Sequence, residues 1–167
     1  MAKVKVISLY QPWAYLFASG AKKNETRPWR TNLRGELYIH ATQKISFNDL
    51  ELCRQSEHFR RYIPDPASGI LVQGAIIGKV HISDVVNVES IRDALLAEER
   101  AFGDYRDGRY AWKADGHTLL DQPIFVKGRQ GIWEYDLPGE PTREPDMMAP
   151  DQRETAERMH YYQHYLK

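Results

Sequence analysis

Hydrophobic and polar positions repeat with the period of a β-strand through much of the chain. Residues 3–9 alternate between lysine and β-branched apolar side chains, which predicts a strand. In residues 36–41 the odd positions are apolar and the even positions carry Glu, Tyr and His, so a second strand with two different faces is expected. The β-branched stretch 70–88 predicts one long bent strand or a hairpin. Further short strands are expected at 110–112, 124–126 and 132–135.

Start and stop signals predict helices between these strands. The first helix begins at Pro12, whose missing N–H suits a first helical position, and ends at Gly20. Serine followed three residues later by aspartate forms a capping box at 46–49 and again at 90–93, with the second helix ending near residue 103. Residues 21–35 contain breakers and are predicted to be irregular.

These elements indicate one α+β domain, mainly β, over residues 1–137. Many short strands interrupted by glycine favour a small closed or half-open β-barrel with peripheral helices. Residues 138–150 are rich in proline and polar side chains and are predicted to form a linker. Residues 151–167 are predicted to be a helical tail, so the stretch 138–167 is expected to lie outside the domain.

The charge of the chain is balanced overall but not along its length. Lys plus Arg and Asp plus Glu both number 23, yet residues 1–44 hold eight basic and two acidic residues, a balance of +6. The remainder carries 15 basic and 21 acidic residues, or −6. A basic N-terminal quarter suits an anionic ligand such as phosphate, although a solvated, salt-bridged surface explains it equally well. The profile is not that of a protein that coats duplex DNA.

Cysteine and hydropathy define the expected surroundings. Cys53 is the only cysteine, which fits a reducing compartment, and neither a signal peptide nor a run of about 20 apolar residues is found. We therefore expect a cytoplasmic protein without a membrane partner. The histidines lack metal-ligand spacing, so no metal and no cofactor are predicted; the oligomeric state stays open.

The first candidate site residues follow the stop of the first helix. Lys22, Glu25 and Arg27 lie in a segment where an extended chain would place Glu25 and Arg27 on one face. Lysine and arginine can clamp a phosphate or a carbonyl oxygen, while the carboxylate orients them or accepts a proton. The alternative is a structural ion pair that holds an irregular loop.

Aromatic and polar side chains elsewhere supply further candidates. Trp29 and Tyr110 could offer ring faces on which a base stacks. His40 could act as an acid, a base or a hydrogen-bond donor, or could be a half-buried structural histidine. A second basic turn is expected at residues 127–131. Its glycines, Gly128 and Gly131, permit close approach of the backbone to a ligand; an ordinary hairpin turn is the alternative. Its candidate ligand contacts are Lys127, Arg129 and Gln130.

Three motifs follow one another near the N-terminus. They are Ser-Leu-x-Gln-Pro-Trp-Ala at 8–14, Gly-x-Lys-x-x-Glu-x-Arg at 20–27 and Arg-Gly-x-Leu-x-Ile-His-Ala at 34–41. With Tyr-Ala-Trp at 110–112 and the glycine-flanked turn up to residue 131, the chain resembles the activating-signal-cointegrator homology (ASCH) family over about residues 4–136. The resemblance implies a β-barrel similar to the PUA fold and a cleft lined by the Lys-Glu-Arg motif. It also implies RNA, a nucleotide or a modified nucleoside as ligand.

Three functions are consistent with these residues. In a binding module, Lys22, Arg27, Arg34 and Arg129 would hold phosphates, Trp29 and Tyr110 would stack a base, and Glu25 would read a base edge. In a partner-binding scaffold, residues 151–167 would dock on the domain or on another protein.

The third possibility is a hydrolase. The resemblance extends to bacterial members that remove the acetyl group from acetylated cytidine, and to a type that cuts RNA. Lys22 would then be the base or nucleophile activator, Glu25 would shuttle a proton, and the backbone of the turn would stabilise an oxyanion. The related deacetylases carry Thr where this chain has Glu25, and the strand expected to supply their Glu, residues 77–83 here, contains no carboxylate.

Overall fold

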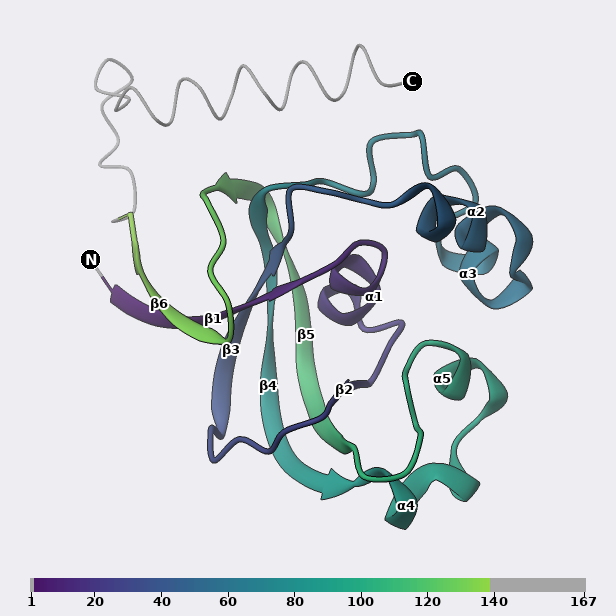
Figure 1. Ribbon diagram of the computed structural model, residues 1–167. Coiled ribbons are helices and arrows are strands. Elements are labelled where there is room, and N and C mark those ends of the chain that lie inside the picture. Colours follow the sequence, from purple (N-terminus) through teal and green to yellow (C-terminus); the bar gives the residue numbers. More distant parts are fainter. Residues whose placement is uncertain (1, 139–167) are drawn as a thin grey trace.

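The computed structural model describes residues 2–138, which form one mixed six-stranded sheet with helices around it (Figure 1). The strand order is β2-β5-β4-β3-β1-β6. Strands β1 and β3 run parallel, and the other neighbouring pairs are antiparallel. The strands are β1 Ala2–Leu9, β2 Asn24–Arg27, β3 Gly35–Ala41, β4 Ala75–Asn87, β5 Tyr110–Phe125 and β6 Ile132–Leu137.

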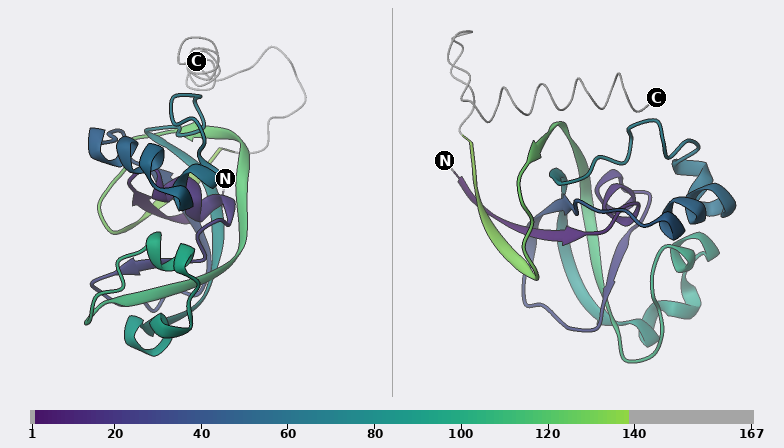
Figure 2. Two further views of the ribbon diagram at one scale, coloured as in Figure 1. Left: turned by 90° about the vertical axis from the view of Figure 1, so that its right-hand side faces the viewer. Right: turned by 45° about the horizontal axis from the view of Figure 1, so that its top comes forward.

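Short helices occupy the connections between the strands. Helix α1 packs against β3, β4 and β5, in the hollow of the bent sheet, while the remaining helices lie to one side of it (Figures 1 and 2). The helices are α1 Trp13–Ser19, α2 Phe47–Gln55, α3 Glu57–Tyr62, α4 Val88–Ile91, the 3₁₀ helix η1 Arg92–Ala94 and α5 Ala97–Ala101. None of the helices within residues 2–138 is both long enough and apolar enough to cross a membrane.

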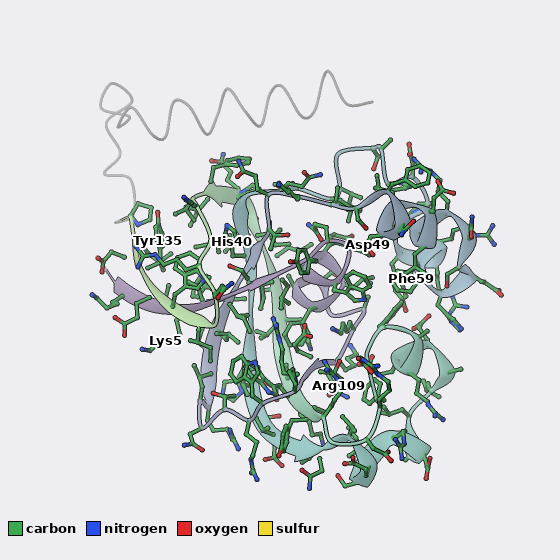
Figure 3. All side chains as sticks on the ribbon, viewed as in Figure 1. Lys5, His40, Asp49, Phe59, Arg109 and Tyr135 are labelled. Carbon is green, nitrogen blue, oxygen red and sulfur yellow. The ribbon has the colours of Figure 1, made fainter. Side chains whose placement is uncertain are left out.

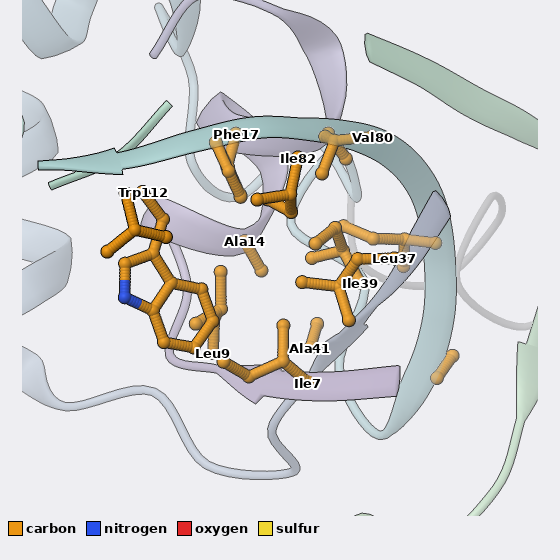
Figure 4. Packing of buried hydrophobic residues seen from close by; sticks show 14 residues of the cluster. Ile7, Leu9, Ala14, Phe17, Leu37, Ile39, Ala41, Val80, Ile82 and Trp112 are labelled. Atoms are coloured by element: carbon orange, nitrogen blue, oxygen red, sulfur yellow. The ribbon is translucent and has the colours of Figure 1, made fainter. Parts of the chain in front are cut away.

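The main core lies between α1 and the concave face of the sheet. Side chains from β1, β3, β4 and β5 meet Ala14 and Phe17 of α1 there, with Trp112 at one end of the cluster (Figure 4). A second cluster joins α2, α3 and Phe102, the residue that follows α5, to Leu16, and in it the rings of Phe59 and Phe102 meet edge to face at 5.0 Å. Helix α1 therefore contributes to both cores, because opposite sides of this one short helix are apolar.

The entry to α1 is fixed by a buried glutamine. The Nε2 of Gln11 donates to the carbonyl of Val72 at 2.8 Å, and its Oε1 accepts from the N–H of Tyr15 at 3.0 Å. At the other end Gly20 takes the left-handed conformation, with φ of 89°, and stops the helix as predicted. The motif at 8–14 thus ties the end of β1 to the loop before β4.

The α+β, mainly β class is confirmed, whereas closure into a barrel is not. Strands β2 and β6 stand at the two ends of the strand order, and within residues 2–138 they do not pair with each other. The four residues of β2 arise in the stretch predicted to be irregular, because they pair with β5 at positions 110–113. The predicted domain boundary stays a prediction, since residues 139–167 lie outside the described residues.

Two other predictions are wrong in detail. The strands expected at 110–112 and 124–126 are the ends of the single strand β5, which continues through Gly116 and Pro123 by pairing with β4 across register shifts. The capping box at Ser90 does not form, because the Ser90 hydroxyl donates to the carbonyl of Asn87 at 2.7 Å instead. The capping box at Ser46 does form, with the N–H of Asp49 donating to its hydroxyl at 3.0 Å.

Candidate functional site

A cleft of about 890 Å³ opens where β1, β2 and β3 approach the connection between β5 and β6. We call this connection, residues 126–131, the strap; it passes the ends of β1 and β3 in the region where Figure 3 places His40. The volume lies in the range of small-molecule and cofactor sites. The lining residues are Ser8, Tyr10, Arg27, Trp29, His40, Thr42, Gln43, Gly74 and Phe125 together with strap residues 126–131.

The strap presents positive charge and unused hydrogen-bond donors. Lys127 and Arg129 are exposed and Gly128 is half-buried. In the part of the chain that the structure describes, neither cation forms an ion pair, and the backbone N–H groups of 127–130 donate to no protein acceptor. Backbone N–H groups and free cations together form a favourable surface for an anion.

Arg27 contributes a third positive charge from the end of β2. Its Nη2 donates to the carbonyl of Ser8 at 3.3 Å, and its Nε is buried without a hydrogen-bond partner among residues 2–138. No carboxylate occurs among the described residues that line the cleft. The cleft is therefore cationic, and no carboxylate among residues 2–138 pairs with its charges.

Two exposed aromatic side chains stand beside these charges. The ring of Trp29 is 37% exposed and meets the buried ring of Trp112 edge to face at 4.8 Å. The Nε1 of Trp112 also donates to the Trp29 carbonyl at 3.3 Å, so the backbone that carries the ring is held as well. Tyr10 is 64% exposed. A ring that is fixed on one side and open on the other can stack on a base.

His40 lies beneath the strap and is only 1% exposed. Its Nε2 is 2.7 Å from the carbonyl oxygen of Val126, so Nε2 carries the proton and donates. Its Nδ1 is buried and has no hydrogen-bond partner in the described structure. Burial lowers the pKa of His40 and so favours the neutral ring, partly opposed by the bond to Val126.

Lys22 and Glu25 form an ion pair in the interior instead of lining the cleft. Their Nζ and Oε2 atoms are 3.1 Å apart, and the residues are 1% and 7% exposed. Glu25 is opposite Trp112 in the register of β2 with β5, and Lys22 lies 5.7 Å from the ring centre of Phe17. The structure therefore does not place Lys22, Glu25 and Arg27 together in one open cleft, since only Arg27 reaches the opening.

An unpredicted carboxylate holds this motif in place. Glu99 of α5 is buried and accepts hydrogen bonds from the N–H of Lys23 at 3.0 Å and of Asn24 at 2.9 Å. Asn24 in turn donates to the hydroxyl of Tyr105 at 3.3 Å. Burial is the main cause of the raised pKa of Tyr105. A contact between residues 75 positions apart leaves no local sequence signal.

Two other candidates lie away from the cleft. The guanidinium of Arg34 donates to the carbonyls of Thr31 and Leu33 and lies 3.5 Å from Asp84. Tyr110 has the guanidinium of Arg30 over its ring, 5.6 Å from the centroid. Neither lines the cleft. Both keep the proposed ligand role only as a prediction.

Several cleft residues were not predicted as site residues. Ser8 and Tyr10 belong to the first motif. Successive side chains of a strand face opposite sides, so an apolar Leu9 that faces the core implies that Tyr10 faces away from it. Thr42 and Gln43 carry no pattern of their own and reach the cleft because they follow β3. Gln130, which was predicted, lines the cleft and is exposed.

Comparison with known proteins places this arrangement in a family. The family model of the ASCH domain matches residues 7–131. The chain belongs to the ASCH family. The match includes the motifs at 8–14, 20–27 and 34–41, and it ends at the last residue of the strap.

Individual relatives of this ASCH protein are distant. It is 24% identical over 133 residues to human activating signal cointegrator 1, covering 78% of this chain and 22% of that protein. The chain thus spans about a fifth of that relative's length. A crystal structure of ASCH from Zymomonas mobilis matches at 20% identity and a TM-score of 0.44, covering 73% of each chain. A mutant of the same bacterial protein matches at 16% identity and a TM-score of 0.47, covering 93% of this chain and 94% of that one.

Proposed function

We propose that this ASCH protein binds RNA, or a nucleotide or modified nucleoside, in the strap-lined cleft. The observation that carries the proposal is the combination of three cations with exposed aromatic rings. Arg27, Lys127 and Arg129 form no ion pair within the described chain, and Trp29 and Tyr10 are exposed beside them. Cations with free backbone N–H groups hold phosphates, and ring faces hold bases. Membership of a family associated with RNA binding supports the same conclusion.

The ligand we expect is single-stranded. A stacked base must leave its helix before a side-chain ring can cover its face, so this mode of binding selects loops and single strands. The balanced total charge of the protein gives no broad basic surface for a duplex. Affinity for a short single strand should therefore exceed affinity for the matching duplex.

A salt titration tests the phosphate contacts. With a fluorescently labelled single-stranded RNA, log K should fall with log salt at a slope of about −2, since three cations contribute about 0.7 each. Replacing Arg27, Lys127 or Arg129 with alanine should each lower the magnitude of the slope by about 0.7. Lys113→Ala, which removes an exposed cation outside the cleft, is the matched control and should keep the wild-type slope. Binding that does not respond to salt would refute the proposal.

The stacking contact has its own test. Trp29→Leu should weaken binding by about 1–3 kcal/mol, the usual value for one stacked base, without changing the salt slope. Trp112 stays in place beneath position 29, and its near-ultraviolet circular dichroism reports whether the core is intact. Unchanged affinity in a folded Trp29→Leu variant would remove stacking from the proposal.

Hydrolysis is a second proposal, motivated by the interior Lys22–Glu25 pair in a family motif. A lysine close to a carboxylate and away from water can serve in proton transfer. Its weakness is access, because neither side chain lines the cleft. Product from acetylated cytidine or from RNA oligomers, formed above the level of a Lys22→Met variant, would support it. The scaffold role of residues 151–167 concerns residues outside the described range and stays a prediction.

A further inference from the structure

Gly128 lies in direct contact with the floor of the cleft. A methyl group added at Gly128 would stand 2.6 Å from Cε1 and 2.8 Å from Nδ1 of His40, and 2.8 Å from Oγ of Ser8. Atoms of this kind do not approach so closely, so something would have to shift. Gly128 therefore uses its lack of a side chain to approach His40 and Ser8 of the protein itself.

The groups beneath Gly128 are not free to move away. The Nε2 of His40 is bound to Val126, and the His40 ring meets the Trp133 ring edge to face at 5.7 Å. The Oγ of Ser8 accepts from Nε1 of Trp133 at 3.2 Å. Ser8 and His40 are also register partners on the parallel strands β1 and β3. A side chain at position 128 would consequently move the strap away from His40 and Ser8 rather than displace these two residues.

This contact determines where the flanking side chains point. A Cβ at position 128 would point toward His40 and Ser8, whereas the flanking Lys127 and Arg129 are exposed and line the cleft. The contact of Gly128 with His40 and Ser8 therefore leaves Lys127 and Arg129 facing the cleft.

We propose that Gly128 and His40 are positioning residues that set the register of the strap, so that Lys127 and Arg129 face the ligand. The proposal rests on the proposed function, because it assigns the means by which the same cleft presents its charge. His40 acts through its bond to Val126 and through its packing against Gly128. Although His40 is among the residues that line the cleft, it is only 1% exposed, so we assign it to positioning the strap rather than to contact with the ligand.

The test compares salt slopes for a labelled single-stranded RNA. Gly128→Ala should lower the magnitude of the slope by about 1.4, twice the value for one cation, although no charge has been removed. The double variant Lys127→Ala/Arg129→Ala should give the same loss. Added to Gly128→Ala, that double substitution should cause no further change, because the two cations no longer contact the ligand. If it lowers the slope by its full amount in that background, the proposal is wrong.

A second pair of variants decides the matter if Gly128→Ala does not fold. His40→Gln keeps a side-chain N–H that can donate to the Val126 carbonyl, and should keep the wild-type slope. His40→Ala removes both the donor and the ring, and should lower the slope as Gly128→Ala does. Loss of the wild-type slope in a folded His40→Gln protein, or its full retention in His40→Ala, would overturn the proposal.

Failure of this inference can be told apart from failure of the binding function. If the wild-type protein binds RNA without salt dependence, the function falls and the positioning role falls with it. If the wild-type slope is near −2 and drops on loss of Lys127 and Arg129, the function stands. An unchanged slope in Gly128→Ala then rejects the positioning role alone.

Discussion

Two groups of charged side chains in this protein have opposite surroundings, although the segment 22–27 contributes to both. Lys22 and Glu25 are buried, paired with each other, and surrounded by core side chains. Arg27, two residues after Glu25, joins Lys127 and Arg129 at an open cleft that has no carboxylate among its described lining residues. Charges that a protein neutralises itself maintain its fold, whereas charges left without a partner are available to a ligand.

The two groups should respond differently to the same substitution. Removing one member of a buried pair leaves the other charge without compensation, which is costly. Removing an exposed, unpaired cation changes stability little and acts on ligand affinity. Measuring both the stability and the ligand affinity of each variant therefore separates the buried charges from those at the cleft. Four predictions test this difference.

The largest loss of stability is expected inside. Lys22→Ala should destabilise the protein by about 3–5 kcal/mol because Glu25 is left buried and unpaired. The double variant Lys22→Met/Glu25→Leu removes both charges and should recover most of that loss. Urea unfolding of each variant measures the effect. A Lys22→Ala protein as stable as the wild type would mean that the pair does not contribute to the fold.

Glu99→Ala should be next in size. It removes the acceptor of the part-buried Lys23 N–H and of the buried Asn24 N–H, and the buried one alone is worth about 1–3 kcal/mol before water or relaxation compensates. Glu98→Ala is the matched control on the same helix, because its carboxylate bonds the more exposed Arg61 and Tyr62, and it should cost less. Equal losses in the two variants would show that Glu99 has no special role in holding the motif.

A smaller effect is expected from pH through His40. Its pKa is lowered in the fold, so the folded state binds fewer protons than the unfolded state, in which the pKa is near 6.5. Stability should be highest above pH 6.5 and decline as the pH falls below it. His40→Gln should flatten this decline in urea unfolding measured above about pH 5, where most carboxylates stay ionised. An identical pH profile in His40→Gln would contradict the assignment.

The smallest effect on stability is expected at the cleft. Lys127→Ala and Arg129→Ala should each change the free energy of unfolding by less than about 0.5 kcal/mol, since both side chains are exposed and neither has an ion-pair partner among residues 2–138. Their effect on the salt slope of RNA binding should remain. Thermal unfolding by circular dichroism gives the first quantity. A clear loss of stability in either variant would place these cations with Lys22 as structural residues.

Much of the fold follows from local pattern. Period-two alternation predicted β1 and β3, a short strand was expected where β6 lies, and Pro12 with Gly20 predicted α1, because these signals act over a few residues. Strand β5 was expected as two short strands, at 110–112 and 124–126. They are one strand because it pairs with β4 along most of its length, and pairing between distant segments leaves no local sequence pattern.

The site was predictable to a lesser degree. Arg27, Trp29 and the basic turn were identified from residue type and flanking glycines, and all of them line the cleft. The burial of Lys22 and Glu25 was not predicted, because sequence spacing shows which residues share a face but not whether that face is buried. Glu99 was missed because its contacts with Lys23 and Asn24 cross 75 or more positions of sequence.

The hydrogen bond from Arg27 to Ser8 spans strands that are not neighbours in the sheet. Strand β2 ends the order on one side and β1 stands next to the last strand on the other, so the sheet curls until a single side chain bridges the remaining distance. No β-ladder joins β2 to β1 in the described chain. Moving β2 and β1 apart to admit a larger ligand therefore breaks this side-chain hydrogen bond, worth about 1 kcal/mol, and keeps the backbone hydrogen bonds between the paired strands.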